Sequence, residues 1–182
     1  MKSLVYVDNS NVWIEGMHVS AVKRGMATNV IVAQRDKICD GWKIDFGKLL
    51  GFAGGEKPTI KRAVLFGSRP PANDSLWSSA KKQGFEVIVY DRNVSNREKK
   101  IDTDIVANMM EDSFSIARAG EDEMVLVAGD KDYVPAIEKI RKRKISVIVC
   151  FWDHAAIELQ KSCDKFISLN PYLEYLAFEK KR

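Results

Sequence analysis

The sequence predicts an α/β fold in which a central parallel sheet is covered by helices on both faces. Five short runs rich in Val and Ile are apolar throughout instead of alternating with polar residues, which is typical of strands buried on both faces. These runs are residues 4–7, 63–66, 85–90, 124–128 and 145–151. Helical patterns separate several of them, so we expect right-handed crossovers between parallel strands.

Three segments have the spacing of amphipathic helices, with apolar residues three and four positions apart. They are residues 74–84, 103–119 and 132–144, and the second of them is the longest. Two stretches lack such regularity. Residues 15–42 give no clear pattern, and residues 91–100 form a polar and mostly basic stretch that we expect to be a loop.

The composition is typical of one globular domain. The 182 residues are 46% hydrophobic and 30% charged, so the chain can bury a substantial core. We expect a single domain over residues 1–182 with its core at about 3–170. The first residues lack the length and cleavage site of a signal sequence, so we expect none, and no apolar run is near the roughly 20 residues of a membrane helix. Its three cysteines are far apart, which argues against a disulfide framework, and we predict a cytoplasmic protein without a membrane partner.

The formal net charge of +4 permits a polyanionic partner without requiring one. Lys and Arg gather at residues 61–62, 81–82, 92–100 and 141–144. Each of these runs could contact a nucleic acid or could be an ordinary solvated face.

Acidic residues follow the predicted strands, where ligands bind in open parallel sheets. Asp8 ends the first run, and Asp130 and Asp132 follow the fourth. Asp102 and Asp104 lie at the start of the longest helical pattern. These acids come from distant parts of the chain, and the topology predicts that they face one crevice.

Clustered carboxylates repel one another unless a cation or hydrogen bonds offset the repulsion. A hard divalent ion such as Mg²⁺ prefers oxygen ligands and often binds through carboxylates together with substrate phosphates. It can activate water and neutralise charge on a phosphodiester. Because the chain has only two histidines, His18 and His154, a metal-activated water is a more attractive nucleophile source than a histidine base.

Several of these residues also have simpler interpretations. Asp132 and Asp102 each stand near the start of a helical pattern and could be N-caps. Asp104 lies about 200° around a regular helix from Asp102, so the two cannot easily face one ion. Asn108, one turn beyond Asp104, could reach the same rim.

The residues after the first strand allow further alternatives. Asn9 and Asn11 could hydrogen-bond the turn, or they could orient Asp8 or a substrate phosphate. Trp13 could pack in the core, or it could stack on a base of the nucleic acid. Tyr133 could also stack on a base.

Taken together, the motifs resemble the NYN domain of the LabA-like or DUF88 group, which belongs to the PIN-like nuclease superfamily. The resemblance rests on VDNSN at 7–11, LFGSRPP at 65–71, KID at 100–102, VAGDKDY at 127–133 and the stretch 158–167. It extends from residue 4 to about residue 169.

The resemblance implies a three-layer PIN-like (Rossmannoid) fold with the strand order 3-2-1-4-5 and an acidic site for Mg²⁺ or Mn²⁺. The family's acidic positions correspond to Asp8, Asp102, Asp130 and Asp132. Many relatives have an acid at the position of Asn108 and a serine at that of Ala128, so this chain departs from the pattern there. Residues 15–42 look longer than the corresponding family region and could form a cap over the site. Relatives often dimerise, which makes a homodimer one option.

We therefore predict a divalent-metal-dependent ribonuclease that hydrolyses RNA phosphodiester bonds, with internal and terminal cleavage both open. Asp8, Asp102 and Asp130 would bind one ion, Asp132 would hold the attacking water or a second ion, and Asp104 and Asn108 would be secondary ligands. The expected substrate-binding residues are Asn9, Asn11, Ser68, Arg69, Arg97, Lys99 and Lys100, with Arg92 in the same basic stretch.

Two other functions compete with this prediction. A non-catalytic module that binds RNA or protein could keep the same fold, and the neutral Asn108 favours it. A phosphatase of the haloacid-dehalogenase type is disfavoured, because it needs an acid two residues after its nucleophile and Ser10 stands there.

Overall fold

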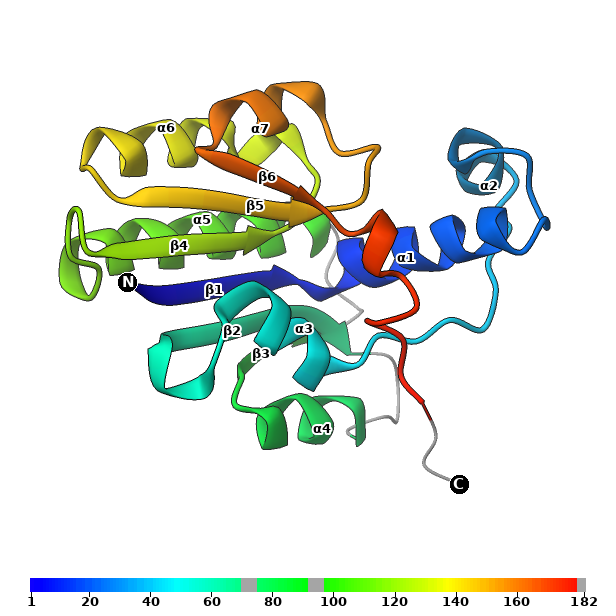
Figure 1. The fold of residues 1–182 in the computed structure, drawn as a ribbon, viewed down its shortest axis with the longest axis horizontal. Coiled ribbons are helices and arrows are strands. Elements are labelled where there is room, and N and C mark those ends of the chain that lie inside the picture. The colour runs from blue at the N-terminus through cyan, green and yellow to red at the C-terminus, as the bar shows by residue number, and fades with distance from the viewer. Residues whose placement is uncertain (70–74, 92–96, 180–182) are drawn as a thin grey trace.

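The computed structural model describes residues 1–69, 75–91 and 97–179, without the side chains of residues 69, 91 and 97–99. The described strands form one six-stranded sheet in the order β3-β2-β1-β4-β5-β6, with all neighbours parallel (Figure 1). The strands are β1 (Lys2–Asp8), β2 (Ile60–Arg69), β3 (Glu86–Asp91), β4 (Asp122–Val127), β5 (Ser146–Phe151) and β6 (Lys165–Ser168). The predicted α/β class and the order 3-2-1-4-5 are confirmed, and β6 extends the sheet beyond β5.

Helices cover both faces of the sheet (Figure 1). They are α1 (Asn9–Lys23), α2 (Val30–Arg35), α3 (Phe46–Gly54), α4 (Ser75–Gln83), α5 (Arg97–Ser115), α6 (Val134–Lys142) and α7 (Ile157–Ser162), with 3-10 turns η1 (Lys57–Thr59), η2 (Lys131–Tyr133) and η3 (Asn170–Tyr172). Side chains of α1, α3 and α4 pack into the core on one face, and those of α5, α6 and α7 pack into the core on the other. None of the described helices is long and apolar enough to span a membrane.

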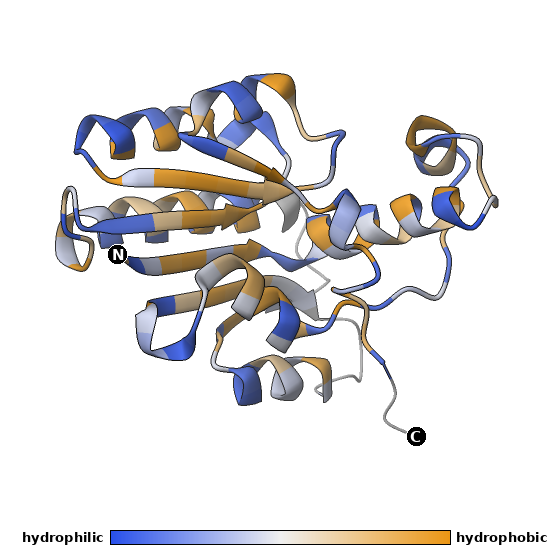
Figure 2. Cartoon of the chain, in the orientation of Figure 1, coloured by the Kyte–Doolittle hydropathy of each residue, from blue (hydrophilic) through white to orange (hydrophobic). Residues whose placement is uncertain are grey.

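The central strand β1 supplies both cores. Val5 and Val7 pack against the face covered by α3, whereas Leu4 and Tyr6 pack against the face covered by α5, and all four are fully buried. Figure 2 shows the central strands as mostly hydrophobic, whereas the surrounding helices mix hydrophilic and hydrophobic residues. Burial on both faces explains the apolar run without alternation, because successive side chains of a strand point to opposite faces.

The long helix α5 begins earlier than the sequence predicts. It starts at Arg97 instead of residue 103, so residues 97–100 are its first turn and not part of a loop. These residues favour a helix by propensity but have no apolar periodicity to reveal it. Asp102 therefore lies inside the helix, and the interpretation of Asp102 as an N-cap is wrong.

The turn between β4 and α6 also differs from the prediction. Helix α6 starts at Val134, after the 3-10 turn η2 that contains Asp132. The N-cap positions of η2 and α6 are Asp130 and Tyr133, and neither makes a side-chain capping hydrogen bond. Asp132 is thus not an N-cap, and helix capping does not account for these two aspartates.

Residues 15–42 continue α1, include α2 and end on a tryptophan cluster. Trp42 packs edge to face against Trp152, with ring centroids 5.6 Å apart, and its Nε1 donates to the Leu173 carbonyl at 3.1 Å. Trp13 Nε1 donates to the Trp42 carbonyl at 3.1 Å, and the ring packs against the same core. Trp13 therefore has the packing role among its two predicted alternatives.

Glu15 joins this segment to the loop after β5. Its Oε2 lies 2.7 Å from His154 Nε2 and accepts a 2.7 Å hydrogen bond from Gln34 Nε2 of α2. Partial burial works to raise the pKa of Glu15, but the hydrogen bonds from His154 and Gln34 outweigh it and lower that pKa below its usual range. The carboxylate thus stabilises, in its charged form, the contact between α1, α2 and the loop after β5.

A buried polar network connects α5 to the central strands. Asp112 Oδ2 accepts hydrogen bonds from Arg62 Nη1 at 2.6 Å and from the Tyr6 hydroxyl at 2.5 Å. Arg62 Nη2 also donates to Asn108 Oδ1 at 3.2 Å and to Glu86 at 2.9 Å. The Asn108 carboxamide is therefore engaged in this network.

We predict that Asp112→Ala lowers the free energy of unfolding by about 3–5 kcal/mol, the cost of removing one partner of a buried ion pair. Asp112 is 2% exposed, so its loss leaves Arg62 and the Tyr6 hydroxyl without their shared acceptor. Urea denaturation measures the change. The matched control is Glu111→Ala, an exposed acid on the same helix, which should have little effect. Equal stabilities of the two variants would contradict the role given to the network.

We also predict that Glu15 contributes stability that depends on pH. Because its pKa is lower in the folded chain than its ordinary value of 4.5, the contribution is present at neutral pH and is lost as the pH falls through the folded pKa. The melting temperature of Glu15→Gln should therefore lie below that of wild type at about pH 7, and the two should converge as the pH falls through the folded pKa of Glu15. Glu56→Gln, at an exposed position, should show no such convergence.

Candidate metal centre

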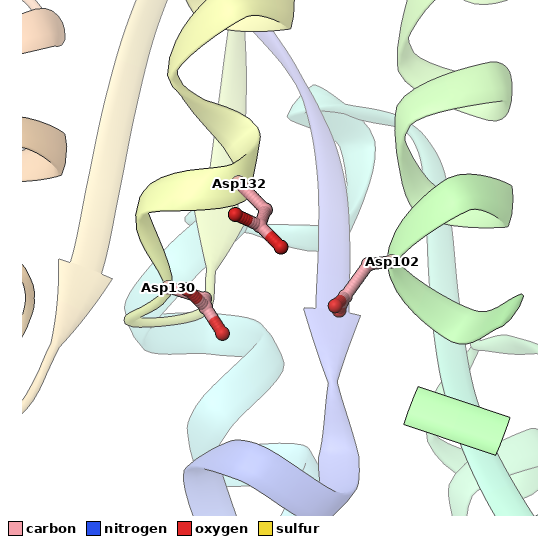
Figure 3. Close-up of side chains that lie close together, drawn as sticks. All are labelled: Asp102, Asp130 and Asp132. Atoms are coloured by element: carbon pink, nitrogen blue, oxygen red, sulfur yellow. The ribbon is translucent and has the colours of Figure 1, made fainter. Parts of the chain in front are cut away.

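Three carboxylates converge at the carboxyl edge of the sheet. Asp102 comes from α5, Asp130 from the residue before η2 and Asp132 from within η2, and one oxygen of each lies within 4.8 Å of the others. Figure 3 shows the three side chains pointing toward one another. Asp102 is half-buried, whereas Asp130 and Asp132 are exposed. The group is thus open to solvent on one side and backed by the protein on the other.

The chemistry of this donor set fits a divalent cation. Two carboxylates at such a separation repel each other by about 1 kcal/mol in water and by about 3–4 kcal/mol at the effective dielectric near a protein surface. Mg²⁺, Mn²⁺ and Ca²⁺ are bound by oxygen ligands, and a cation among the three oxygens would offset the repulsion. The arrangement is compatible with metal binding and does not by itself select the metal.

Asp8 stands beside this group and has a second task in the fold. It is 8% exposed and ends β1, and its Oδ1 accepts a 3.1 Å hydrogen bond from the Asn11 backbone amide. Asp8 is therefore the N-cap of α1, a role for which aspartate is well suited. Its other oxygen, Oδ2, lies 3.4 Å from the Tyr133 hydroxyl.

Tyr133 connects Asp8 to the three carboxylates. Its hydroxyl donates to Asp102 Oδ1 at 2.6 Å, and its side chain is fully buried. Burial, the charge of Asp8 and the hydrogen bond to Asp102 all raise the pKa of Tyr133 well above its usual range, so the hydroxyl stays neutral. The prediction that Tyr133 stacks on a base is wrong, because the ring is enclosed in the core with Ile137.

Asn11 links the two loops that carry the acidic residues. Its Oδ1 accepts a 3.0 Å hydrogen bond from the backbone amide of Gly129, the residue before Asp130. The side chain thus holds the loop after β4 against the start of α1. Asn9 is 4% exposed, and its Oδ1 has no hydrogen-bond partner within the described residues.

The other predicted site residues are not part of the group of three carboxylates. Asp104 is half-buried on α5 and does not belong to the group of three carboxylates, and Asn108 contacts Arg62 instead. Ser68 is half-buried near the carboxyl end of β2, and Lys100 Nζ lies 4.5 Å from the ring centroid of Tyr90 on β3. The side chains of Arg69, Arg97 and Lys99, and the whole of Arg92, lie outside the described part of the chain.

Sequence reasoning missed two contacts that shape the site. One is the capping bond of Asp8, which was hidden because α1 begins with the polar residues 9–11 and its start was not recognised. The other is the hydrogen bond from the Tyr133 hydroxyl to Asp102. A buried tyrosine hydroxyl usually has a hydrogen-bond partner, and the acids around it in the sequence were the available signal.

Comparison with known proteins gives the chain a family and a matching fold. The NYN domain family profile matches residues 5–170. A solved structure of a protein of unknown function from Vibrio parahaemolyticus is similar, with a TM-score of 0.65, 20% sequence identity and 92% of each chain covered. At this identity the likeness extends to the fold alone. No curated protein matched the chain.

We predict that Gly129→Ala disturbs the acidic group. An added Cβ would lie 2.1 Å from Phe151 Cε1, and this ring is 2% exposed and has little room to move. Overpacking of this kind costs about 1–3 kcal/mol of unfolding free energy. It should also shift the adjacent Asp130 and weaken Mn²⁺ binding in a calorimetric titration.

The control for this variant is Gly51→Ala. Gly51 lies on an exposed position of α3, and a Cβ there meets no atom within 4 Å. Alanine should raise helix stability there by about 0.5–1 kcal/mol. A Gly129→Ala protein that is as stable as Gly51→Ala and binds Mn²⁺ like wild type would refute the close packing described for this loop.

Proposed function

The chain belongs to the NYN domain family, a nuclease-like family of the PIN-like superfamily, and we propose that it is a divalent-metal-dependent ribonuclease. The observation that carries the proposal is the convergence of Asp102, Asp130 and Asp132 at the carboxyl edge of the sheet. Open parallel sheets bind their ligands at this edge, where the strand order reverses. Here the reversal lies between β1 and β4, and Asp8 and Asp130 follow these two strands.

In this proposal Asp102, Asp130 and Asp132 hold one Mg²⁺ or Mn²⁺, with Asp8 behind them. The ion would supply water activation and would neutralise charge on the phosphodiester. Asp130 and Asp132 are exposed, and in this proposal a nucleic acid strand would approach from the solvent side. The more buried Asp8 accepts from the Asn11 amide and contacts the Tyr133 hydroxyl, which donates to Asp102.

RNA is the substrate that we propose for this site. Exposed Lys131 lies between the two exposed acids in the sequence, and exposed Lys100 precedes Asp102 by two residues. Lysines beside an acidic site can bind the phosphates that flank the scissile bond, and such contacts position a strand without reading its sequence. We assign the same role to Arg69, Arg97 and Lys99, and we assign phosphate contacts to Asn9, Asn11 and Ser68 as a further part of this proposal.

The test is cleavage of single-stranded RNA by the purified protein with Mn²⁺ or Mg²⁺, compared with Asp130→Asn and Asp8→Asn. We expect each variant to lose about 100-fold in rate, because even the residues that support metal ligands account for about 10–100-fold. Asparagine at position 8 can still cap α1, so loss of activity there reports on charge and not on folding. The control is Asp36→Asn, which alters an exposed carboxylate at the end of α2.

Three further substrates sharpen the result. A circular RNA is cut only by internal cleavage, a DNA of the same sequence tests the sugar, and a simple phosphate monoester tests the phosphatase alternative. Cleavage that continues in chelator, or that is equal in wild type and Asp130→Asn, would exclude the proposed mechanism. RNA binding without any turnover would instead favour the non-catalytic module.

A further inference from the structure

Tyr133 occupies a position between the acidic side chains that no other buried tyrosine hydroxyl of the described chain shares. It ends η2, directly after Asp132, and its ring is packed in the core beneath α5. From there its hydroxyl lies 2.6 Å from Asp102 Oδ1 and 3.4 Å from Asp8 Oδ2. The hydroxyl therefore stands between a carboxylate on α5 and a carboxylate at the end of β1.

The chemistry of these three groups determines how they interact. Ionised carboxylates only accept hydrogen bonds, and a neutral tyrosine has a single proton to donate. The shorter contact assigns that proton to Asp102, with Asp8 as the more distant acceptor. The hydroxyl thus places a donor between two carboxylates that can themselves only accept hydrogen bonds.

Asp8 is restrained from two sides. Its Oδ1 accepts from the Asn11 amide at 3.1 Å, and its Oδ2 faces the Tyr133 hydroxyl. Asp8 is rigidly tied to the start of α1, so its link to Tyr133 relates the position of Asp102 to the sheet itself. A carboxylate that must meet two others within 4.8 Å benefits from such a restraint.

We propose that Tyr133 is a positioning residue of the metal centre, whose hydroxyl holds Asp102 in the orientation that binds the ion and couples it to Asp8. This inference rests on the proposed metal site. It assigns to Tyr133 no contact with the substrate and no part in proton transfer. Its consequence is that loss of one oxygen atom from the buried core weakens metal binding while the fold persists.

The test is the affinity for Mn²⁺ alone, measured by calorimetry and by electron paramagnetic resonance of the bound ion, in Tyr133→Phe and wild type. We expect the Kd of Tyr133→Phe to rise by about 10–100-fold, as is found when a hydrogen-bond partner of a metal ligand is removed. The resonance of the bound ion should also change, because one carboxylate is less restrained. Circular dichroism and the melting temperature show whether the variant is folded.

The chain supplies a matched control in Tyr6→Phe. Tyr6 is also fully buried in the core beneath α5, and its hydroxyl also donates to an aspartate of that helix, Asp112 at 2.5 Å. Tyr6→Phe should lower the melting temperature and leave the Mn²⁺ Kd unchanged. An equal rise of Kd in both variants would assign the effect to general destabilisation and overturn the proposal.

A double variant tests the link to Asp8. If the hydroxyl couples the two carboxylates, the Kd changes of Tyr133→Phe and Asp8→Asn are not additive in the combined protein. Additive changes, or a Kd of folded Tyr133→Phe within about twofold of wild type, would overturn the proposal.

The outcomes separate this inference from the proposed function. A wild-type protein that binds Mn²⁺ but does not cleave RNA would remove the ribonuclease and still allow the comparison of Kd values to support Tyr133. If the wild-type protein cleaves RNA and Tyr133→Phe binds Mn²⁺ normally, the ribonuclease proposal is supported and the proposed role of Tyr133 is overturned. A wild-type protein that binds no Mn²⁺ overturns both.

Discussion

The constraint on which the rest of this structure depends is the parallel direction of its strands. Because β1 and β4 are neighbours and run the same way, the residues that follow them emerge at one edge of the sheet. Asp8 and Asp130 are far apart in the sequence and are brought together by this pairing alone. Helix α5 then crosses behind the sheet and brings Asp102 to the same edge (Figure 1). The order and direction of the strands thus bring the acidic residues to one edge, and individual contacts then set their orientation.

Repulsion between the gathered carboxylates opposes folding, and hydrogen bonds to these carboxylates offset part of that repulsion. Asp8 accepts a hydrogen bond from the backbone amide of Asn11, and Asp102 accepts one from the Tyr133 hydroxyl. The backbone amide of Gly129 in the loop after β4 donates to the Asn11 side chain. Each of these donors is neutral, so none removes the negative charge of the site. Neutral donors of this kind restrain the orientation of a carboxylate and leave its charge in place, which is compatible with metal binding.

Much of the fold follows from the sequence, and the parts that do not have physical reasons. The Val- and Ile-rich runs identify five strands correctly, because burial on both faces leaves no room for polar residues. Strand β6 escaped recognition since its four residues at the edge of the sheet are at most half-buried and carry Lys165. The first turn of α5 escaped it because residues 97–100 are basic or polar and do not reveal which face is buried.

The site was predictable to a similar degree and for related reasons. Asp130 and Asp132 follow from their position after a strand, Asp102 follows from the start of the longest helical pattern, and the family motif includes all three. The structure brings these three together. Asn108 could not be placed, because its partner Arg62 comes from another strand, and only the packing of α5 on β2 brings them into contact. The same holds for Tyr133. The sequence suggests that its ring stacks on a base, whereas the contact of its hydroxyl with Asp102 depends on how α5 packs against the sheet.

Asn108 stands where many relatives have an acid, which raises the question of whether this chain lacks part of its family's site. An amide in place of an acid suggests a weakened second ion site, which was the reason for considering a non-catalytic module. In the structure that amide belongs to the network of Arg62 and Asp112, and the acidic group forms without it. The group of Asp102, Asp130 and Asp132, with the Tyr133 hydroxyl donating to Asp102, is compatible with a single ion. The neutral residue at position 108 is therefore compatible with a one-metal centre and does not by itself argue against catalysis.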